Sequence, residues 1–454
     1  MENLHFESAL LPDGWARNVR VEIAAGRIVR IQRDADAASR DERAKVALPG
    51  MPNVHSHAFQ RGLAGLTEYR GSTADNFWSW RELMYRFCAR MTPEDLEAVS
   101  AMAFVEMLEG GFTRAGEFHY VHHDPSGKAY ADPAEMARRV AAACAETGIG
   151  LTLLPVFYAH AGFGGQPPNE GQRRFVHDID GFAKLLEAGR GIVAGLRGAT
   201  LGVAPHSLRA VTPEELREVV SLAPEGPVHM HAAEQVKEVE DCVAWSGKRP
   251  VEWLLDNAAL NERWCLVHAT HMTRAEISRL GTSGAVAGFC PVTEANLGDG
   301  IAPAAPLVAA GGTFGIGTDS NVSISVCEEL RQLEYGQRLR DRARNVIAAS
   351  GSQSTGRALF DGALRGGSRA LAQPDAGLVE GATADLFTLD TDSPALAERE
   401  GDALLDSFIF GGGHAAIDGV WRAGHKVVTR GQHHAREGVV RRYRAALKRL
   451  IVGA

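Results

Sequence analysis

The sequence has few cysteines, no long apolar run and no excess of positive charge. Its six cysteines among 454 residues include no Cys-x-x-Cys pair, which excludes a disulfide scaffold and is typical of reduced, buried thiols. No uninterrupted apolar run reaches the roughly 18 residues that span a bilayer. Glu2, Glu7 and Asp13 interrupt the apolar residues near the start, so we expect no signal peptide. These features predict a cytoplasmic protein.

Positive charge is in deficit, because 48 Lys and Arg stand against 56 Asp and Glu, a formal net charge of −8 at pH 7. We therefore expect neither a nucleic-acid partner nor an anionic membrane partner. The remaining composition, 45% hydrophobic and 23% charged, is that of an ordinary globular protein. A chain of 454 residues is too long for one ordinary domain and predicts a large barrel with a smaller domain.

The middle of the chain alternates apolar strand patterns with helical patterns. Thr92-Pro93, Asp132-Pro133 and Thr212-Pro213 mark three helix starts, each with a capping residue followed by proline. Eight β/α units in series predict a (β/α)8 TIM-like barrel, in which catalytic side chains lie at the C-terminal ends of strands. The expected strands are residues 47–57, 112–118, 149–158, 200–205, 227–232, 264–269, 284–290 and 312–318.

Both ends of the chain have short alternating strand patterns instead. Residues 19–23 and 27–31 predict one hairpin, and residues 384–390 and 419–428 have a matching pattern. We expect one small β-sandwich domain built from both ends of an α/β protein. The expected division is sandwich at 1–48, metal-dependent barrel at 49–372, and the rest of the sandwich with a tail helix at 373–454.

Two histidines separated by one residue, His55 and His57, end the first expected barrel strand. Alternate residues of a strand point to the same face, so both imidazoles can aim at one point. Neutral imidazole is a common ligand of zinc and of other divalent metals. An isolated His-x-His pair is weak evidence, because two partly buried polar side chains give the same pattern.

Later strand ends add side chains of the same kind. His231 lies near the end of strand 227–232, and Glu234 follows it by three residues. His268 ends the next strand, and Asp319 follows the last one. The C-terminal ends of barrel strands meet at one rim, so these residues are expected to converge there.

This set resembles the amidohydrolase superfamily over nearly the whole chain. The resemblance rests on Pro-Gly-Met-Pro-Asn-Val-His-Ser-His at 49–57, His-x-x-Glu at 231–234, the next-strand histidine and Gly-Thr-Asp at 317–319. It implies one divalent metal rather than two, because the third and fourth strand ends offer no lysine. Zinc is the expected ion, although nitrogen and oxygen ligands leave iron open. The implied metal ligands are His55, His57, His231 and Asp319.

The resemblance also implies catalytic roles. Asp319 would take a proton from the attacking water, His268 would orient that water, and Glu234 would protonate the leaving nitrogen. Relatives with one metal and such a glutamate are chiefly deaminases that act on C=N groups. The other histidines of these segments are expected to be structural, surface or loop residues: His122, His123, His229 and His271.

Five segments are similar to one family within the superfamily, the formimidoylglutamate deiminases of histidine degradation: residues 58–63, 76–85, 115–123, 206–211 and 290–300. This resemblance implies hydrolysis of N-formimino-L-glutamate to N-formyl-L-glutamate and ammonia. Such a substrate has two carboxylates, and the guanidinium of arginine binds carboxylate bidentately. The expected substrate-binding residues are Gln60, Arg81, Tyr120, His206 and Arg209.

The residues themselves leave two alternative functions open. A deaminase of a purine or related heterocycle is one, although Cys-Pro-Val-Thr-Glu at 290–294 departs from the Cys-Pro-x-Ser-Asn turn usual in nucleobase deaminases. A non-catalytic scaffold of the same fold is another, although the chain keeps the complete ligand set. Residues 162–168 are either a mobile loop near the site or a plain connection. Related enzymes suggest a homodimer, which no pattern in the chain encodes.

Overall fold

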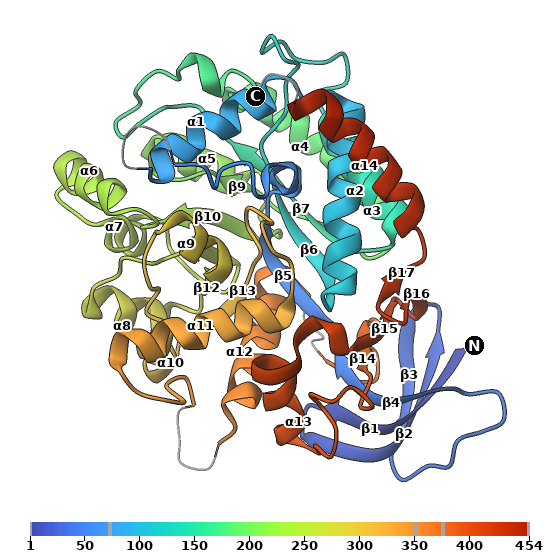
Figure 1. The fold of residues 1–454 in the computed structure, drawn as a ribbon. Coiled ribbons are helices and arrows are strands. Elements are labelled where there is room, and N and C mark those ends of the chain that lie inside the picture. The colour runs from blue at the N-terminus through green and yellow to red at the C-terminus, as the bar shows by residue number, and fades with distance from the viewer. Residues whose placement is uncertain (1, 71–74, 349–352, 374–376, 452–454) are drawn as a thin grey trace.

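Strands from the two ends of the chain pair in one eight-stranded sheet (Figure 1). The computed structural model describes residues 2–70, 75–348, 353–373 and 377–451. The strand order is β17-β16-β15-β14-β4-β1-β2-β3, and only β1 and β4 pair in parallel. The strands are β1 (Glu2–Leu11), β2 (Gly14–Ala24), β3 (Arg27–Gln32), β4 (Glu42–Pro49), β14 (Leu386–Leu389), β15 (Ile417–Arg422), β16 (His425–Thr429) and β17 (Gln432–His433).

Both ends of the chain contribute strands to this one sheet, and its strands follow one continuous order. Its two halves meet where β14 pairs with β4, with Leu386 opposite Pro49. Register shifts in the β2–β3, β14–β15 and β15–β16 pairs let such a sheet bend. Leu4, Phe6, Val21 and Trp421 fill a buried cluster on this sheet.

Parallel strands form the middle of the molecule. One sheet has the order β5-β6-β7-β8, with β9 also on β7, and a second has the order β10-β11-β12-β13. Isolated parallel bridges, Val203 to Val228 and Ser56 to Asp319, connect the edges of the two sheets in a circular order. The strands are β5 (Met51–Ser56), β6 (Phe112–His119), β7 (Gly150–Phe157), β8 (Thr200–Leu201), β9 (Ala204–Pro205), β10 (Val228–Ala232), β11 (Trp264–His268), β12 (Val286–Phe289) and β13 (Thr313–Ile316).

Every expected barrel strand contains a strand of the structure, which confirms the α/β class, but two are divided. Gly50 separates β4 from β5 within 47–57, and a side chain there would collide with that of Thr113. The expected strand 200–205 is broken between β8 and β9. A side chain at Gly202 would collide with the Pro227 carbonyl.

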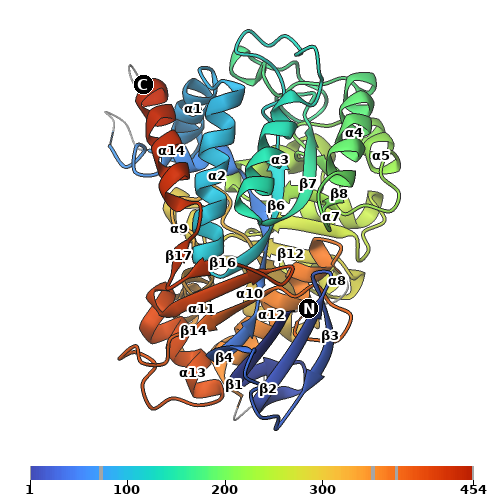
Figure 2. The same ribbon diagram turned by 90° about the vertical axis from the view of Figure 1, so that its right-hand side faces the viewer.

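Helices connect the parallel strands and cover them (Figures 1 and 2). Thr92 and Thr212 cap their helices as expected, and both form capping boxes. The third helix begins at Glu135, and Asp132 accepts from the Ala134 N–H before it at 2.9 Å. The helices of this part are α1 (Phe77–Cys88), α2 (Pro93–Glu109), α3 (Glu135–Thr147), α4 (Ile179–Ala194), α5 (Pro213–Ser221), α6 (Val236–Ser246), α7 (Pro250–Asn257), α8 (Arg274–Ser283), α9 (Pro291–Leu297), α10 (Ala304–Ala309), α11 (Val326–Asp341) and α12 (Thr355–Ala370).

Two further helices follow β14 in the chain, α13 (Asp402–Ser407) and α14 (Arg436–Ile451). The tail helix α14 lies beside α2 in both views, so it covers the parallel-strand part of the molecule rather than the terminal sheet (Figure 2). Across the described ranges, no helix combines the length and apolarity needed to cross a membrane.

Candidate active site

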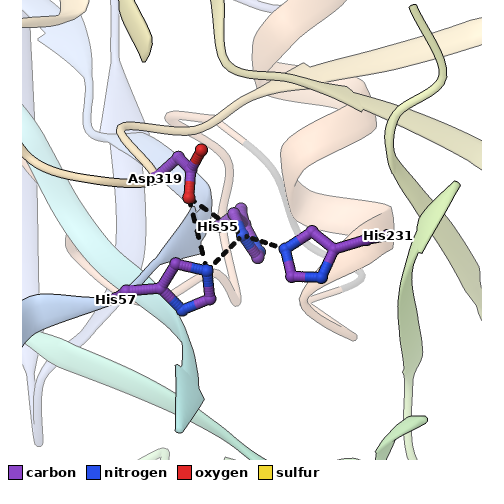
Figure 3. A group of neighbouring side chains, drawn as sticks. All are labelled: His55, His57, His231 and Asp319. Atoms are coloured by element: carbon purple, nitrogen blue, oxygen red, sulfur yellow. Dashed lines mark hydrogen bonds and ion pairs between the residues drawn. The ribbon is translucent and has the colours of Figure 1, made fainter. Parts of the chain in front are cut away.

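Four side chains from distant parts of the sequence converge at the ends of the parallel strands (Figure 3). His55 and His57 come from β5, His231 from β10 and Asp319 from the segment after β13. The Nε2 atom of His55 lies 3.2 Å from Nε2 of His57 and 3.1 Å from Nε2 of His231. Asp319 Oδ1 lies 3.4 and 3.3 Å from the Nε2 atoms of His55 and His57. All four residues are buried.

The hydrogen bonds around these imidazoles favour metal binding. His57 Nδ1 lies 2.9 Å from the Phe118 carbonyl oxygen, and His231 Nδ1 lies 3.1 Å from that of His206. A carbonyl only accepts, so both Nδ1 atoms carry hydrogen and both Nε2 lone pairs face His55. Nε2 of His55 holds at most one hydrogen, which cannot satisfy two lone pairs and a carboxylate. A divalent cation satisfies all four groups, and the donor set suits zinc.

Burial keeps these ligands in the protonation state that metals bind. Desolvation, with the neighbouring His57, lowers the pKa of His55 to about 3. Desolvation also lowers the pKa of His57 and of His231. Burial alone would raise the pKa of Asp319, but hydrogen bonding and charge from His55, with charge from nearby histidines, hold it below its ordinary value. At neutral pH the cluster is three neutral imidazoles and one carboxylate.

The backbone near the cluster is held in an unusual conformation. Asp319 has φ 44° and His268 has φ 68°, both in the left-handed region that non-glycine residues rarely adopt. The Asp319 N–H donates to the His55 carbonyl at 2.9 Å, and the His57 N–H donates to the Asp319 carbonyl at 2.9 Å. These bonds fix the end of β5 against the segment after β13. Strained backbone of this kind clusters at functional sites.

His268 and Glu234 stand beside the ligand cluster. His268 Nε2 lies 3.8 Å from Glu234 Oε1 and 3.8 Å from Asp319 Oδ2. Burial raises the pKa of Glu234 to about 7, a value suited to proton transfer at neutral pH. Burial would lower the pKa of His268, but the carboxylates of Glu234, Glu294 and Asp319 raise it to about 10.

A cavity opens from the metal-ligand cluster toward α1. Ten of its lining residues are candidates from the sequence, and the eleventh candidate, His55, is fully buried and is not part of the lining. These ten candidates and the seven other described lining residues include no lysine. The candidates in the lining are His57, Gln60, Arg81, Tyr120, His206, Arg209, His231, Glu234, His268 and Asp319.

Two arginines, Arg81 and Arg209, make part of this cavity cationic. The Nε atoms of Arg81 and Arg209 are buried without a hydrogen-bond partner in the described structure. Gln60 Nε2 donates to the Tyr120 hydroxyl at 2.7 Å, which leaves Gln60 Oε1 without a partner. His206 lines the cavity nearby and its Nδ1 lies 3.1 Å from the Ser207 hydroxyl. Buried polar atoms without partners fit a polar, anionic ligand.

Comparisons with known proteins agree with this geometry. The Amidohydrolase family profile matches residues 46–427, and the profile "Formimidoylglutamate deiminase HutF, N-terminal domain" matches residues 1–45. The chain belongs to the amidohydrolase family. The sequence resemblance to that superfamily is therefore confirmed, and membership implies a TIM-barrel fold with a separate N-terminal domain.

Individual relatives cover this amidohydrolase almost completely. It is 52% identical to a formimidoylglutamate deiminase of Pseudomonas aeruginosa over 99% of this chain and 100% of that protein. It is 31% identical to an 8-oxoguanine deaminase of the same species, over 92% and 90% of the two chains. A solved amidohydrolase of Brucella melitensis has a TM-score of 0.97 and 57% identity, over 99% of this chain and 100% of that one.

A more distant solved structure shares the fold alone. An adenosine deaminase from Xanthomonas campestris with bound zinc has a TM-score of 0.82 at 23% identity, over 99% of this chain and 98% of that one.

Sequence reasoning did not single out two residues that support the site of this amidohydrolase. The Trp78 ring on α1 contacts both arginines, with Cζ of Arg81 4.6 Å and Cζ of Arg209 5.7 Å from its centroid. Glu294 on α9 lies 3.3 Å from His268 Nδ1 through Oε1. The aromatic run at 77–80 beside Arg81 is a signal for Trp78. Glu294 has no such local signal.

The other expected histidines lie outside the cavity. His229 Nε2 donates to the Ala370 carbonyl at 2.7 Å, and His271 Nε2 donates to that of Asp299 at 2.9 Å. His122 and His123 follow β6 in a loop, but both are buried and donate to backbone carbonyls.

The stretch 162–168 is a tight turn with a bridge between Gly162 and Gln166. Phe163 within it stacks on Trp245. None of the cavity's described lining residues belongs to this stretch, so its position is that of a plain connection.

Proposed function

We propose that this amidohydrolase is a formimidoylglutamate deiminase. It hydrolyses N-formimino-L-glutamate with one water to N-formyl-L-glutamate and ammonia, as a step of histidine degradation. Full-length identity of 52% to a protein of that name supports the assignment. The observation that carries the substrate is the pair of arginines with unpaired buried Nε atoms in the cavity beside the metal-ligand cluster.

The cavity suits this substrate in its charge and in its hydrogen-bonding groups. Two guanidinium groups match two carboxylates, one each, and arginine stays charged at any working pH. Removing one charged hydrogen bond costs about 1.5–3 kcal/mol of binding. Gln60, Tyr120 and His206 supply neutral hydrogen-bonding groups, and the ring centroids of Tyr120 and His206 lie 4.9 and 4.8 Å from those of the ligands His57 and His231. The formimino group is then placed between the arginines and the metal ligands.

His55, His57, His231 and Asp319 would hold the metal, and we propose a single zinc ion. Zinc in such a site supplies a nucleophilic water at neutral pH by lowering the pKa of that water. No lysine lies among the described cavity residues to bridge a second ion of the usual binuclear kind.

The protein groups divide the proton transfers between two sides of the reacting carbon. Asp319 Oδ2 faces His268 and takes a proton from the attacking water. His268, held through Nδ1 by Glu294, orients that water. Glu234, with Oε1 3.8 Å from His268 Nε2, delivers a proton to the leaving nitrogen. Ammonia leaves after the C–N bond breaks, and the carbon keeps the water oxygen as the formyl group.

A purine deaminase is the competing activity, because an 8-oxoguanine deaminase is among the relatives. Heterocycles carry no pair of carboxylates, so the two guanidinium groups that line the cavity would stay unpaired with such a ligand. The arginines therefore favour the dianionic substrate.

An ammonia-release assay on the zinc-loaded protein tests the assignment. We expect turnover of N-formimino-L-glutamate, weaker turnover of the shorter N-formimino-L-aspartate, and none of guanine or 8-oxoguanine. Equal or better turnover of either purine would overturn the proposal. Absence of ammonia with all four compounds, in protein that holds one zinc per chain, would instead support a non-catalytic scaffold.

We further propose a cytoplasmic location, which the chain's six free and buried cysteines support. The expected homodimer stays a prediction that light scattering on the purified protein can test.

A further inference from the structure

A second group of metal-binding donors shares Asp319 with the first. His268, Cys290 and Asp319 each offer one ligand atom, and these three atoms lie within 4.8 Å of one another. All three residues are buried. They come from the ends of β11, β12 and β13, three neighbouring strands. Their convergence therefore follows from the parallel sheet rather than from one flexible loop.

One buried carboxylate fixes two of the three donors. Glu294 Oε1 lies 3.3 Å from His268 Nδ1 and accepts from the Cys290 backbone N–H at 2.9 Å. With Nδ1–H directed at Glu294, the Nε2 atom of His268 is left facing Asp319 Oδ2 at 3.8 Å. A carboxylate behind an imidazole in this way is the usual support of a histidine that binds a metal.

The two oxygens of Asp319 face different partners. Oδ1 lies 3.4 and 3.3 Å from His55 and His57, whereas Oδ2 faces His268. A carboxylate placed so can bridge two cations, as in protein sites where two metals lie about 3.5–4 Å apart. Nothing in the proposed reaction uses the thiol of Cys290.

We infer that His268, Cys290 and Asp319 form a second cation site, selective for soft divalent ions such as cadmium or excess zinc, whose occupancy inhibits the enzyme. Thiolate ligands select zinc and cadmium over magnesium and calcium. Binding transfers two protons to the solvent, one from the Cys290 thiol and one from Nε2 of the His268 imidazolium, and the sulfur and the nitrogen then each donate an electron pair to the ion. The site inhibits because the second ion occupies His268 Nε2 and Asp319 Oδ2, which the proposed reaction needs for water.

The binding part of this inference is independent of substrate and can be tested first. Zinc-loaded enzyme is titrated with cadmium, then gel-filtered, and the zinc and cadmium contents are measured by mass spectrometry. We expect about one zinc and one cadmium per chain, with the ultraviolet charge-transfer band of a cadmium–thiolate bond. If cadmium only replaces zinc, so that the total stays at one ion per chain, the second site does not exist. Bound cadmium without the charge-transfer band would also overturn the site.

Cys290→Ser is the deciding variant, and Cys242→Ser is its matched control. Cys242 is another buried thiol, on α6, and in the described structure it belongs to no group of metal donors. We expect Cys290→Ser to lose the band and the second ion, and Cys242→Ser to keep both. If Cys290→Ser melts early, Cys290→Ala measured at low temperature replaces it. Equal cadmium binding by all variants would contradict the inference.

Inhibition is the second part and rests on the proposed function. Deiminase activity of the wild-type protein should fall severalfold as cadmium fills the second site. Cys290→Ser should keep its basal activity and lose this sensitivity. Equal inhibition of both proteins would refute an inhibitory role for the site. If the substrate assignment fails, the metal content and the charge-transfer band still decide whether the site exists.

Discussion

At the scale of single residues, the chemistry depends on which nitrogen of each histidine carries hydrogen. His57 and His231 each donate Nδ1–H to a backbone carbonyl, so Nε2 remains available to a cation. His268 donates Nδ1–H to the Glu294 carboxylate instead, and a carboxylate partner stabilises the imidazolium form. The same side-chain type therefore serves as ligand in one place and as proton-bearing group in another, according to the acceptor behind it.

Glu234→Gln tests the proton transfer to the leaving nitrogen. The amide keeps the size of the side chain but cannot deliver a proton, so we expect kcat to fall at least about 100-fold. Zinc content should stay at one per chain, because Glu234 is not among the four ligands. Steady-state kinetics and metal analysis measure both quantities. A variant with near wild-type kcat would remove Glu234 from the reaction.

Arg209→Ala tests carboxylate binding. Loss of a charged hydrogen bond of about 1.5–3 kcal/mol should raise KM about 10- to 100-fold, with a smaller effect on kcat. Arg209→Lys is the matched control and should recover only part of the loss, because an ammonium cannot bind a carboxylate bidentately. An unchanged KM in Arg209→Ala would place the substrate carboxylates elsewhere.

At the scale of elements, the sequence predicted most of what positions the site. Each of the eight expected barrel strands contains a strand of the structure, because its apolar run is bounded by turns and helix caps. Strand β1 lies outside the strands expected from the sequence. The pattern at 47–57 predicts one strand where the structure has two, because Gly50 passes the chain between two sheets without interrupting the apolar pattern. Contacts made only by the fold, such as Glu294 behind His268, leave no trace in local spacing.

Helix α1 contributes a test of its own, because Trp78 lies against both arginines. Each cation–π contact is worth about 0.5–2 kcal/mol, and the ring also keeps two like charges in place. Trp78→Leu should raise KM severalfold and leave kcat nearly unchanged. Trp78→Phe keeps an aromatic face and should stay closer to wild type. Equal kinetics for the leucine and phenylalanine variants would show that the ring face has no such role.

Helix α12 packs so closely on β13 that one of its residues has to be glycine. A side chain at Gly366 would overlap the carbonyl group of Phe314. Gly366→Ala should therefore lower the free energy of unfolding by about 1–3 kcal/mol. Gly191 on α4 has open space around it, so Gly191→Ala should raise that free energy by about 0.5–1 kcal/mol. Urea unfolding of both variants measures the two effects, and a shift of the same sign in both would contradict the packing argument.

At the scale of the whole molecule, the loops after β6 and β7 are joined by histidines that carry no role in the proposed reaction. His122 and His177 have ring centroids 4.9 Å apart, and those of His123 and His177 are 4.6 Å apart. His122 Nε2 donates to the Val156 carbonyl at 3.0 Å. These rings pack as neutral groups, so the fold depends on their staying unprotonated.

This dependence predicts how stability changes with pH. Burial, with the neighbouring His123, lowers the pKa of His177 to about 4, and burial lowers that of His122 as well. In the unfolded chain both are near the ordinary value of about 6.5, so the unfolded state binds more protons below that pH. Their contribution is fully present above pH 6.5 and is lost as pH falls toward 4, at up to about 1.4 kcal/mol per pH unit for each histidine.

His177→Gln removes one of these titrating groups and should make the loss of stability between pH 6.5 and 4 less steep. His414→Gln, at an exposed position, is the matched control and should keep the wild-type slope. Urea unfolding at several pH values measures the slopes, which stay informative even if the variant is less stable at neutral pH. If His177→Gln keeps the wild-type slope of unfolding free energy against pH, the acid sensitivity arises elsewhere. The substitution removes the one group at this position that takes up a proton on unfolding.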